Sequence, residues 1–170
     1  MLWLDLEMSG LDTETCRILE VAAIVTDLQL NELDSYMDIV YQPQEVLDRM
    51  DDWCTEHHGK SGLTAAVADG VPEAEVEANL RALVDRHWSS SQMAILCGNT
   101  ISTDRRFIDK YWPTVAERLH YRMLDVSSWK IMFQYRYGIH VHKAKGHRAL
   151  DDIRESIAEL QAYLDRVKDD

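Results

Sequence analysis

Two acidic side chains within one apolar run constrain this chain more than any other feature of its sequence. The run Leu2–Met8 alternates apolar and acidic residues, which is typical of a β-strand buried on one side. Because side chains two positions apart in a strand share a face, we expect the carboxylates of Asp5 and Glu7 about 7 Å apart along the backbone. Like charges this close resist ionisation unless a cation lies between them, and the hard ions Mg²⁺ and Mn²⁺ prefer oxygen ligands. Taken alone, the pair fits a metal site and a solvated polar face equally well.

The whole chain predicts one α/β domain that spans residues 1–170. The strand Leu2–Met8 and two further runs, Arg17–Asp27 and Ser35–Tyr41, predict an antiparallel meander. Helices alternating with short strands follow, so we expect a mixed sheet flanked by helices. No regular structure is assigned to Asp51–Thr64. The expected helices are Pro43–Met50, Pro72–Arg86, Asp104–Tyr111, a short one from Pro113, Val126–Tyr135 and Ala149–Val167, and the expected later strands are Ala94–Gly98 and Tyr121–Leu124.

The charge balance restricts how this chain can meet nucleic acid. It carries 30 acidic and 18 basic residues, for a formal net charge of −12 at pH 7. Proteins that follow long nucleic acid usually present a basic face, because neutralising phosphates supplies much of their affinity. Any nucleic acid contact is therefore expected to be short and to depend on metal ions and a few local basic groups.

The sequence predicts neither a membrane partner nor an oxidising compartment. No apolar stretch reaches the length of a membrane span, and no signal-peptide pattern opens the chain. Cys16, Cys54 and Cys97 are odd in number and widely spaced, which favours free thiols in a reducing compartment. We expect a cytoplasmic protein, or an organellar one if a targeting segment has been removed.

Two more acidic residues and a histidine occupy unusual places. Asp104 follows the buried run Ala94–Gly98, and Asp152 falls in the first turns of the last helix, five residues after His147. Two helical residues five apart would point about 140° away from each other, so His147 is expected in the loop or cap ahead of the helix. Each residue also has an ordinary explanation, because acids suit helix N-termini and a histidine suits the surface.

In order, these residues read D-x-E, then one Asp, then H-x-x-x-x-D. That order resembles the DEDDh 3′→5′ exonucleases, and the strings around it resemble the oligoribonuclease family among them. The resemblance covers the chain from end to end and implies a ribonuclease H-like fold, with the first three strands antiparallel and the later ones parallel. The strings that carry it are Trp3–Leu11, Met50–Trp53, Cys97–Asn99, Asp104–Phe107, His120–Arg122, Leu124–Ser127 and His147–Ser156.

The resemblance also implies two-metal hydrolysis of phosphodiesters, in which one ion activates water and the other stabilises the leaving oxygen. His147 would be the general base, a role that suits histidine because its unperturbed pKa lies close to working pH. The five-residue spacing from His147 selects Asp152 over Asp151, which is expected to begin the helix or to support the site from outside. The expected ligands of two divalent cations, Mg²⁺ or Mn²⁺, are Asp5, Glu7, Asp104 and Asp152.

By the same resemblance, side chains around the acids hold a very short RNA, down to a dinucleotide. Leu11 is expected to wedge against one base and Trp53 to stack on the other; the alternative for both is ordinary core packing. Arg122 is expected to bind the terminal phosphate at the 5′ end, which would block longer strands. Tyr121 is expected to reach the site of a second subunit, which implies a homodimer. The residues expected to surround the same 5′ end with Arg122 are Ser127, His58 and Thr100, and Asn99 is a further expected substrate-binding residue.

Two other functions stay open on the sequence alone. A DEDDh exonuclease that trims or proofreads longer DNA or RNA ends would keep the fold and change the substrate. A dimeric binding module would keep the fold and lose the reaction, although all five catalytic-type residues are present. Two histidine tracts, His57–Lys60 and His140–His142, lack partners at zinc spacing, so we expect no zinc site. The basic stretch Arg136–Lys145 favours a solvated loop over a phosphate contact.

Overall fold

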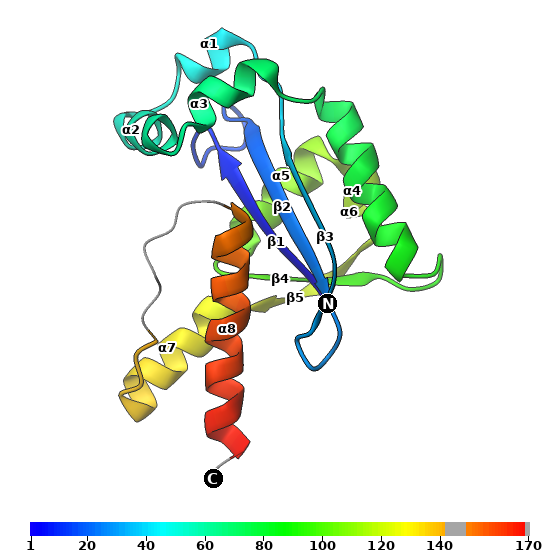
Figure 1. Cartoon of the computed structure of the whole chain (residues 1–170), viewed down its shortest axis with the longest axis vertical. Coiled ribbons are helices and arrows are strands. Elements are labelled where there is room, and N and C mark those ends of the chain that lie inside the picture. Colours follow the sequence, from blue (N-terminus) through cyan, green and yellow to red (C-terminus); the bar gives the residue numbers. More distant parts are fainter. Residues whose placement is uncertain (142–148, 169–170) are drawn as a thin grey trace.

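The computed structural model describes residues 1–141 and 149–168. Its strands are β1 (Leu2–Met8), β2 (Ile18–Thr26), β3 (Glu32–Ile39), β4 (Ala94–Gly98) and β5 (Leu119–Asp125). They form a five-stranded sheet in the order β3-β2-β1-β4-β5 (Figure 1). β2 is antiparallel to both β1 and β3, whereas β4 is parallel to both β1 and β5. The expected mixed sheet, antiparallel in its first three strands and parallel afterwards, is therefore confirmed.

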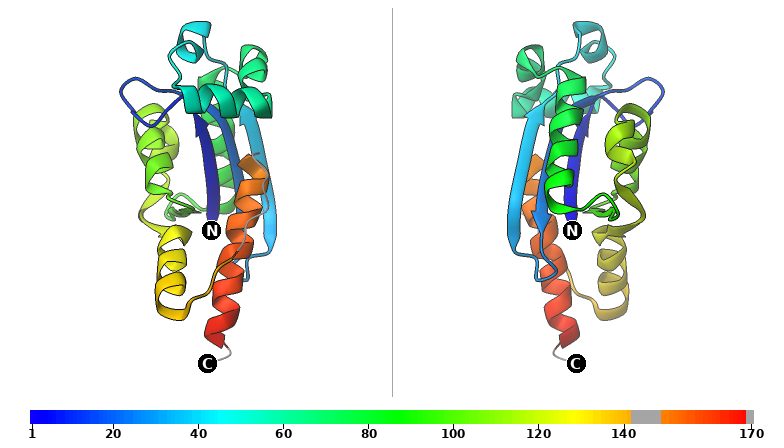
Figure 2. Two further views of the ribbon diagram at one scale, coloured as in Figure 1. Left: turned by 90° about the vertical axis from the view of Figure 1, so that its left-hand side faces the viewer. Right: turned by 90° about the vertical axis from the view of Figure 1, so that its right-hand side faces the viewer.

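Helices cover both faces of this sheet. They are α1 (Gln44–Leu47), α2 (Asp52–Ser61), α3 (Leu63–Ala66), the 3₁₀ turn η1 (Val67–Asp69), α4 (Glu73–His87), α5 (Ser102–Tyr111), α6 (Pro113–Ala116), α7 (Val126–Tyr137) and α8 (Ala149–Lys168). The two side views in Figure 2 place α4 on one face of the sheet and α8 on the other. Within the described ranges, no helix is both long and apolar enough to cross a membrane.

The alternation in β1 divides its side chains between two cores. Leu4 and Leu6 pack in one core with buried residues of α4, α5 and α6. Trp3 points to the opposite face and packs with buried residues of α7 and α8. Because Asp5 and Glu7 alternate in phase with Trp3, the strand presents both carboxylates on the face that α8 covers.

The segment Asp51–Thr64, to which the sequence pattern assigns no regular structure, is helical over most of its length. Asp51 begins α2 by accepting a hydrogen bond from the backbone N–H of Cys54 at 2.7 Å, as a typical N-cap residue does. Gly62 ends the helix with a left-handed φ of 81°. Only Cys54 and His58 are buried in α2, so its apolar periodicity is too weak to predict a helix.

Several other expected boundaries are wrong, and the largest differences concern α1, β3 and β5. The helix expected at Pro43–Met50 is the single turn α1, because Asp51 begins the next helix directly behind it. β3 begins earlier than expected because the Asp27 carboxylate accepts hydrogen bonds from two backbone N–H groups and closes a tight turn just ahead of it. β5 is longer than expected because it pairs with β4 from the first residue of β4 to the last.

Candidate active site

Three carboxylates from opposite ends of the chain meet on the face of β1 that α8 covers. Asp5 and Glu7 come from β1, and Asp152 comes from the first turn of α8, which packs against β1 and β2. One carboxylate oxygen of each residue lies within 4.8 Å of the others. All three side chains are partly buried. Several half-buried carboxylates that converge in this way fit a hard divalent cation, which prefers oxygen ligands.

Asp104 lies next to β1 but is not one of these three residues. It is buried near the start of α5, and its Oδ1 accepts a hydrogen bond from the backbone N–H of Leu6 at 2.9 Å. That bond fixes the carboxylate against the strand that carries Asp5 and Glu7. Its place among the metal ligands stays a prediction.

Burial raises the pKa values of two acids of the site, Glu7 and Asp104, and neighbouring negative charges add to the rise. Burial first, and then the negative charges of Glu20, Asp152 and Asp104, raise the pKa of Glu7 to about 7. Burial also raises the pKa of Asp104 to about 7, against the opposing effect of its hydrogen bond from Leu6. The site therefore holds more negative charge than it can stabilise by itself, and a bound cation would relieve that repulsion.

Glu20 belongs to this electrostatic group, although it is not among the residues that the sequence predicts for the site. It faces Glu7 directly in the antiparallel ladder between β1 and β2, and it is only 3% exposed. The signal was present in the sequence, because Glu20 is the one charged residue of β2, whose other residues before Thr26 are all apolar. Buried carboxylates are rare unless they have a partner or a functional reason.

We expect the metal-free protein to be less stable at pH 8 than at pH 5.5. Because the folded pKa of Glu7 is raised, the folded protein binds more protons than the unfolded chain between the ordinary glutamate pKa and about 7. Its stability therefore falls as pH rises through this window. Thermal unfolding at both values measures the effect, and Mg²⁺ or Mn²⁺ added at pH 8 should raise the unfolding temperature.

A Glu7→Gln variant is the control for this pH dependence. The substitution removes one of the two groups whose pKa is raised to about 7, while Asp104 remains, so the difference in unfolding temperature between pH 5.5 and pH 8 should shrink without vanishing. Groups whose pKa is lowered, such as Asp34 at about 2, titrate below this window. An unchanged difference in Glu7→Gln would assign the pH dependence to other groups.

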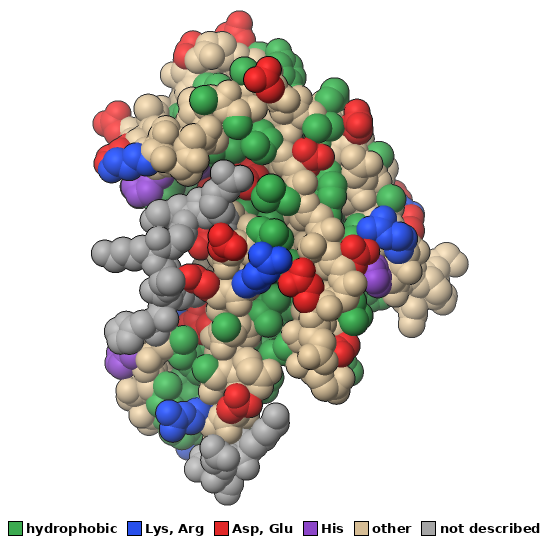
Figure 3. Space-filling view, viewed as in Figure 1, with side chains coloured by type: hydrophobic (Ala, Val, Ile, Leu, Met, Phe, Trp, Pro, Cys, Tyr) green, Lys and Arg blue, Asp and Glu red, His purple; other side chains and the backbone are tan. Residues whose placement is uncertain are grey.

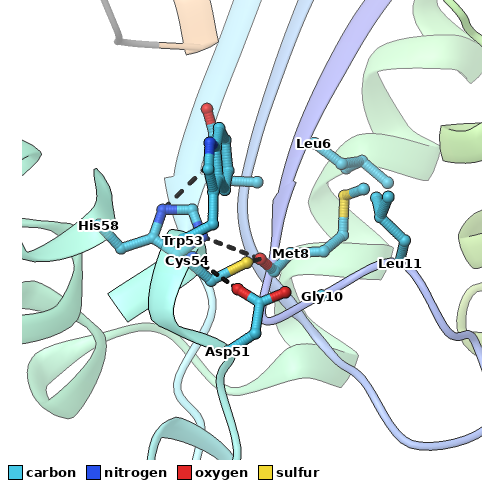
Figure 4. A pocket seen from close by; sticks show the side chains of 9 residues that line it. Leu6, Met8, Gly10, Leu11, Asp51, Trp53, Cys54 and His58 are labelled. Atoms are coloured by element: carbon cyan, nitrogen blue, oxygen red, sulfur yellow. Dashed lines mark hydrogen bonds and ion pairs between the residues drawn. The ribbon is translucent and has the colours of Figure 1, made fainter. Parts of the chain in front are cut away.

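A cavity of about 360 Å³ adjoins the acids at the end of β1 (Figure 4). Leu11 borders it from the loop after β1, and Trp53 borders it from α2. Leu11 is 70% exposed and Trp53 is 61% exposed, so neither belongs to an ordinary core. The Trp53 ring stacks on His57 with a centroid separation of 3.9 Å and an interplanar angle of 17°. The cavity thus has one aliphatic and one aromatic wall.

His58 links this cavity to the acids. Its buried ring lies with Nε2 2.9 Å from the carbonyl oxygen of Met8, so Nε2 carries a hydrogen and donates it. Its Nδ1 lies 3.9 Å from a carboxylate oxygen of Glu7. Among the described residues, Asp5, Glu7 and Asp152 form the only metal-competent group, and it contains no histidine.

A polar network joins the end of β4 to α8. The backbone N–H of Thr100 donates to the Ser127 hydroxyl at 3.0 Å, and that hydroxyl lies 3.4 Å from the side-chain oxygen of Asn99. The Asn99 amide donates to Ser156 at 2.6 Å, and Ser156 in turn donates to the backbone carbonyl of Asp152 at 2.8 Å. Three of the expected substrate-binding residues are therefore connected to the helix that carries Asp152.

Arg122 and Tyr121 lie apart from this network on β5, at one edge of the sheet. Tyr121 is 71% exposed, and the Arg122 guanidinium lies over its ring at 4.9 Å from the centroid. The contacts described for the Tyr121 ring are with His120 and Arg122. The structure therefore places both expected residues on an open edge, where they face solvent.

Two neighbouring acids at the start of α8 differ in their surroundings. Asp151 is exposed and lies 3.7 Å from Arg154, whereas Asp152 lies with Asp5 and Glu7. This arrangement supports the choice of Asp152 over Asp151. His147, the expected general base, lies outside the described residues, and so does His142.

Comparison with known proteins gives relatives over nearly the whole chain. The model of the RNase_T exonuclease family matches residues 2–160. An oligoribonuclease of Francisella tularensis subsp. tularensis (strain WY96-3418) is 45% identical over 98% of this chain and 95% of that protein. The human mitochondrial oligoribonuclease is 44% identical over 98% of this chain and 73% of that protein.

Solved structures of exonuclease I are similar in fold. The E. coli exonuclease I–ssDNA complex matches with a TM-score of 0.70 at 17% identity, over 98% of this chain and 40% of that one. Exonuclease I from Methylocaldum szegediense matches with a TM-score of 0.65 at 19% identity, over 97% of this chain and 40% of that one. The chain spans about two fifths of these longer proteins, and the likeness concerns the fold alone. The ribonuclease H-like fold expected from the sequence is thereby confirmed.

Proposed function

Since this chain belongs to the exonuclease family and, within it, to the oligoribonucleases, we propose that it completes RNA decay by hydrolysing very short oligoribonucleotides to 5′-mononucleotides. It is a metal-dependent 3′→5′ exoribonuclease. The family match over residues 2–160 supports one exonuclease domain across residues 1–170. The observation that carries the proposal is that Glu7 belongs both to the acid group and to the wall of the cavity, so the cavity lies directly beside the proposed metal ligands.

We propose Asp5, Glu7, Asp104 and Asp152 as ligands of two divalent cations, Mg²⁺ or Mn²⁺. Their clustering on one face of β1 and the raised pKa values of Glu7 and Asp104 support this assignment. Such ions, when bound, would activate water and stabilise the leaving oxygen. We propose that His147 accepts the proton of the attacking water, a role that rests on the sequence resemblance.

The cavity beside Glu7 is proposed to hold the bases. Leu11 contacts one base, and Trp53 stacks on the other, because its flat ring is exposed and already held by His57. His58 is proposed to contact the sugar-phosphate between the cavity and the acids. The hydroxyls of Thr100 and Ser127, with Asn99 behind them, are proposed to bind the far end of the substrate.

We expect activity to be greatest on a dinucleotide and to fall as the RNA grows from two to ten nucleotides. A side chain bound to the 5′ end of a dinucleotide would leave no room for further nucleotides. Acidic side chains also outnumber basic ones on the face drawn in Figure 3, which disfavours contact with a longer phosphate backbone. Initial rates on a length series with Mg²⁺ or Mn²⁺ measure this. A rate that climbs with length would replace the proposal with the trimming or proofreading of longer ends.

The Arg122→Ala variant tests whether Arg122, which faces solvent on the edge strand β5 of the single chain, binds the 5′ end of the substrate. Arg122 is proposed to bind the terminal 5′ phosphate with a guanidinium held over Tyr121. Its loss should lower activity about tenfold on a 5′-phosphorylated dinucleotide and less on one without that phosphate, since a hydrogen bond to a charged group contributes about 1.5–3 kcal/mol. Equal losses on both substrates would remove Arg122 from the phosphate site.

We propose a homodimer in which Tyr121 reaches the partner's site. Its support is the open edge of β5 and the exposed apolar side chains of α7, which are Ile131, Met132, Tyr135 and Tyr137. Light scattering of the active enzyme should give the mass of two chains, and mixing Tyr121→Ala with Asp152→Asn protein should restore part of the activity that each lacks. A fully active monomer would contradict the proposal.

We also propose a reducing compartment, the cytoplasm, as the place of action. Cys16, Cys54 and Cys97 are free thiols, and two of them are buried. The human relative is named as mitochondrial, so an organellar copy is the alternative. Fractionation of source cells followed by immunodetection distinguishes the two.

A further inference from the structure

The loop between β1 and β2, residues 9–17, carries Leu11. It is held from outside by Tyr111, the last residue of α5. The Tyr111 hydroxyl lies 2.6 Å from the carbonyl oxygen of Thr13 and 2.9 Å from that of Cys16, and its single hydrogen can be donated to either. The same hydroxyl accepts a hydrogen bond from Nη1 of Arg17 at 2.6 Å. One side chain therefore contacts the loop at two separate points of its backbone.

Arg17 completes this attachment. Its Nη1 also donates to the carbonyl oxygen of Cys16 at 2.9 Å, and its guanidinium lies 4.8 Å from the centroid of the Tyr111 ring. Burial raises the pKa of Glu73 at the start of α4, and the nearby Arg17 charge opposes that rise. On the outer side, Lys110 lies 2.7 Å from the Glu14 carboxylate. The loop is thus fixed to α5 by neutral and charged groups together.

The loop is also closed on itself. Asp12 accepts from the backbone N–H of Glu14 at 3.0 Å and from the Thr15 hydroxyl at 2.9 Å, and its carbonyl accepts from the N–H of Cys16 at 2.8 Å. Gly10 has a φ of 154°, and a Cβ there would lie 2.6 Å from the sulfur of Cys16. Leu11, exposed between these fixed points, therefore stands on an ordered backbone.

We propose that Tyr111 is a positioning residue for Leu11: by fixing the loop before substrate arrives, it keeps the cavity between Leu11 and Trp53 ready for a base. The inference rests on the proposed function of Leu11 and Trp53. Its physical basis is that a loop ordered in advance does not lose conformational freedom at the moment of binding. Tyr111 contacts neither the acids nor the cavity wall among the contacts described for it. It acts through the loop.

The Tyr111→Phe variant tests this role because it removes the hydroxyl and keeps the ring. The KM for a dinucleotide should rise about tenfold, since the hydrogen bonds lost are those that order the loop. The kcat should stay within about twofold of that of the unaltered protein, because the acids are untouched. For the same reason, the rise in unfolding temperature on adding Mn²⁺ should differ by no more than about two degrees. Tyr41→Phe is the matched control, since Tyr41 is 48% exposed and outside the site; it should change none of these quantities.

Leu11→Ala separates this inference from the proposed function. If Leu11 contacts a base, Leu11→Ala raises the KM by itself, and adding Tyr111→Phe to it should raise the KM hardly further. Additive losses would overturn the positioning role and leave the base contact standing. No effect of Leu11→Ala on the KM would instead overturn the proposed base contact.

Hydrogen exchange in the unaltered protein provides a second test that does not depend on a variant folding. The amides of Thr15, Cys16 and Arg17 should exchange at least about a hundredfold more slowly than in an unstructured chain, because each is hydrogen-bonded within the loop. Exchange at the unstructured rate would show that the loop is not held, and would overturn the inference.

Discussion

Replacing Asp152 with asparagine should lower kcat on a dinucleotide by about a thousandfold, which corresponds to about 4 kcal/mol of lost transition-state stabilisation. The substitution keeps the shape of the side chain and removes one negative charge from the group formed with Asp5 and Glu7. A neutral amide oxygen is a much weaker ligand for a hard divalent ion than a carboxylate. Single-turnover hydrolysis at saturating Mg²⁺ or Mn²⁺ measures the loss.

The neighbouring variant Asp151→Asn is the matched control. It makes the same change of charge one residue away, but the Asp151 side chain is exposed and lies near Arg154. It should keep activity within about twofold of the unaltered enzyme, because exposed ion pairs contribute little. If Asp151→Asn lost as much activity as Asp152→Asn, the loss would come from the charge of the helix and not from a ligand.

Although Asp152→Asn should lower activity, it should not lower the stability of the metal-free protein. Asp152 is one of the charges that raise the pKa of Glu7, so removing it relieves repulsion in the metal-free protein. The unfolding temperature without metal should therefore stay level or rise, while the stabilisation by added Mn²⁺ should largely disappear. An inactive variant that is also unstable without metal would indicate a folding defect.

Trp53→Ala should raise the KM for a dinucleotide about thirtyfold, because stacking of a base on an aromatic side chain contributes about 2 kcal/mol. The ring is 61% exposed at the surface of α2, so its removal leaves no cavity in a core. It stands parallel to His57 before any base arrives, which limits the ordering that binding requires. Steady-state kinetics should place the change in KM, with kcat within about threefold.

Two companion variants make the Trp53 result specific. Trp53→Phe keeps a smaller aromatic face and should raise the KM only about threefold, since part of the stacking remains. Thr55→Ala alters an exposed position of the same helix and should leave the KM unchanged. An unchanged KM in Trp53→Ala would remove Trp53 from the base-binding surface.

The sequence predicts most of the sheet and most of the acid group for one physical reason. The alternation of apolar and polar residues in β1 predicts which side chains share a face of the strand, so it assigns Asp5 and Glu7 to the same face. The strongly apolar sequence of β2 likewise predicts a buried strand. Asp152 is selected differently, by its five-residue spacing from His147 in the pattern that resembles the DEDDh exonucleases. These assignments depend on local order along the chain, which a sequence displays directly.

The parts that the sequence misses depend on contacts between distant segments. α2 is hidden because its buried side chains are few, although Asp51 marks its start. Glu20 matters only because the register of β1 and β2 places it opposite Glu7. Tyr111 reads as an ordinary helix residue until the fold brings α5 against the loop after β1. Each of these features depends on strand pairing or on packing between distant segments. None of them produces a repeating pattern in the sequence from which it could be predicted.

The meeting of β1 and α8 at one carboxylate group has a consequence for the unfolded chain. Asp5 and Asp152 are separated by almost the whole sequence, so an ion held by both would act as a reversible cross-link that closes a very long loop. Such closures restrict the unfolded ensemble most when the loop is long, as a disulfide does. Unlike a disulfide, this one would break and re-form with the concentration of a free ion, so that the chain's topology would follow the metal supply of its surroundings.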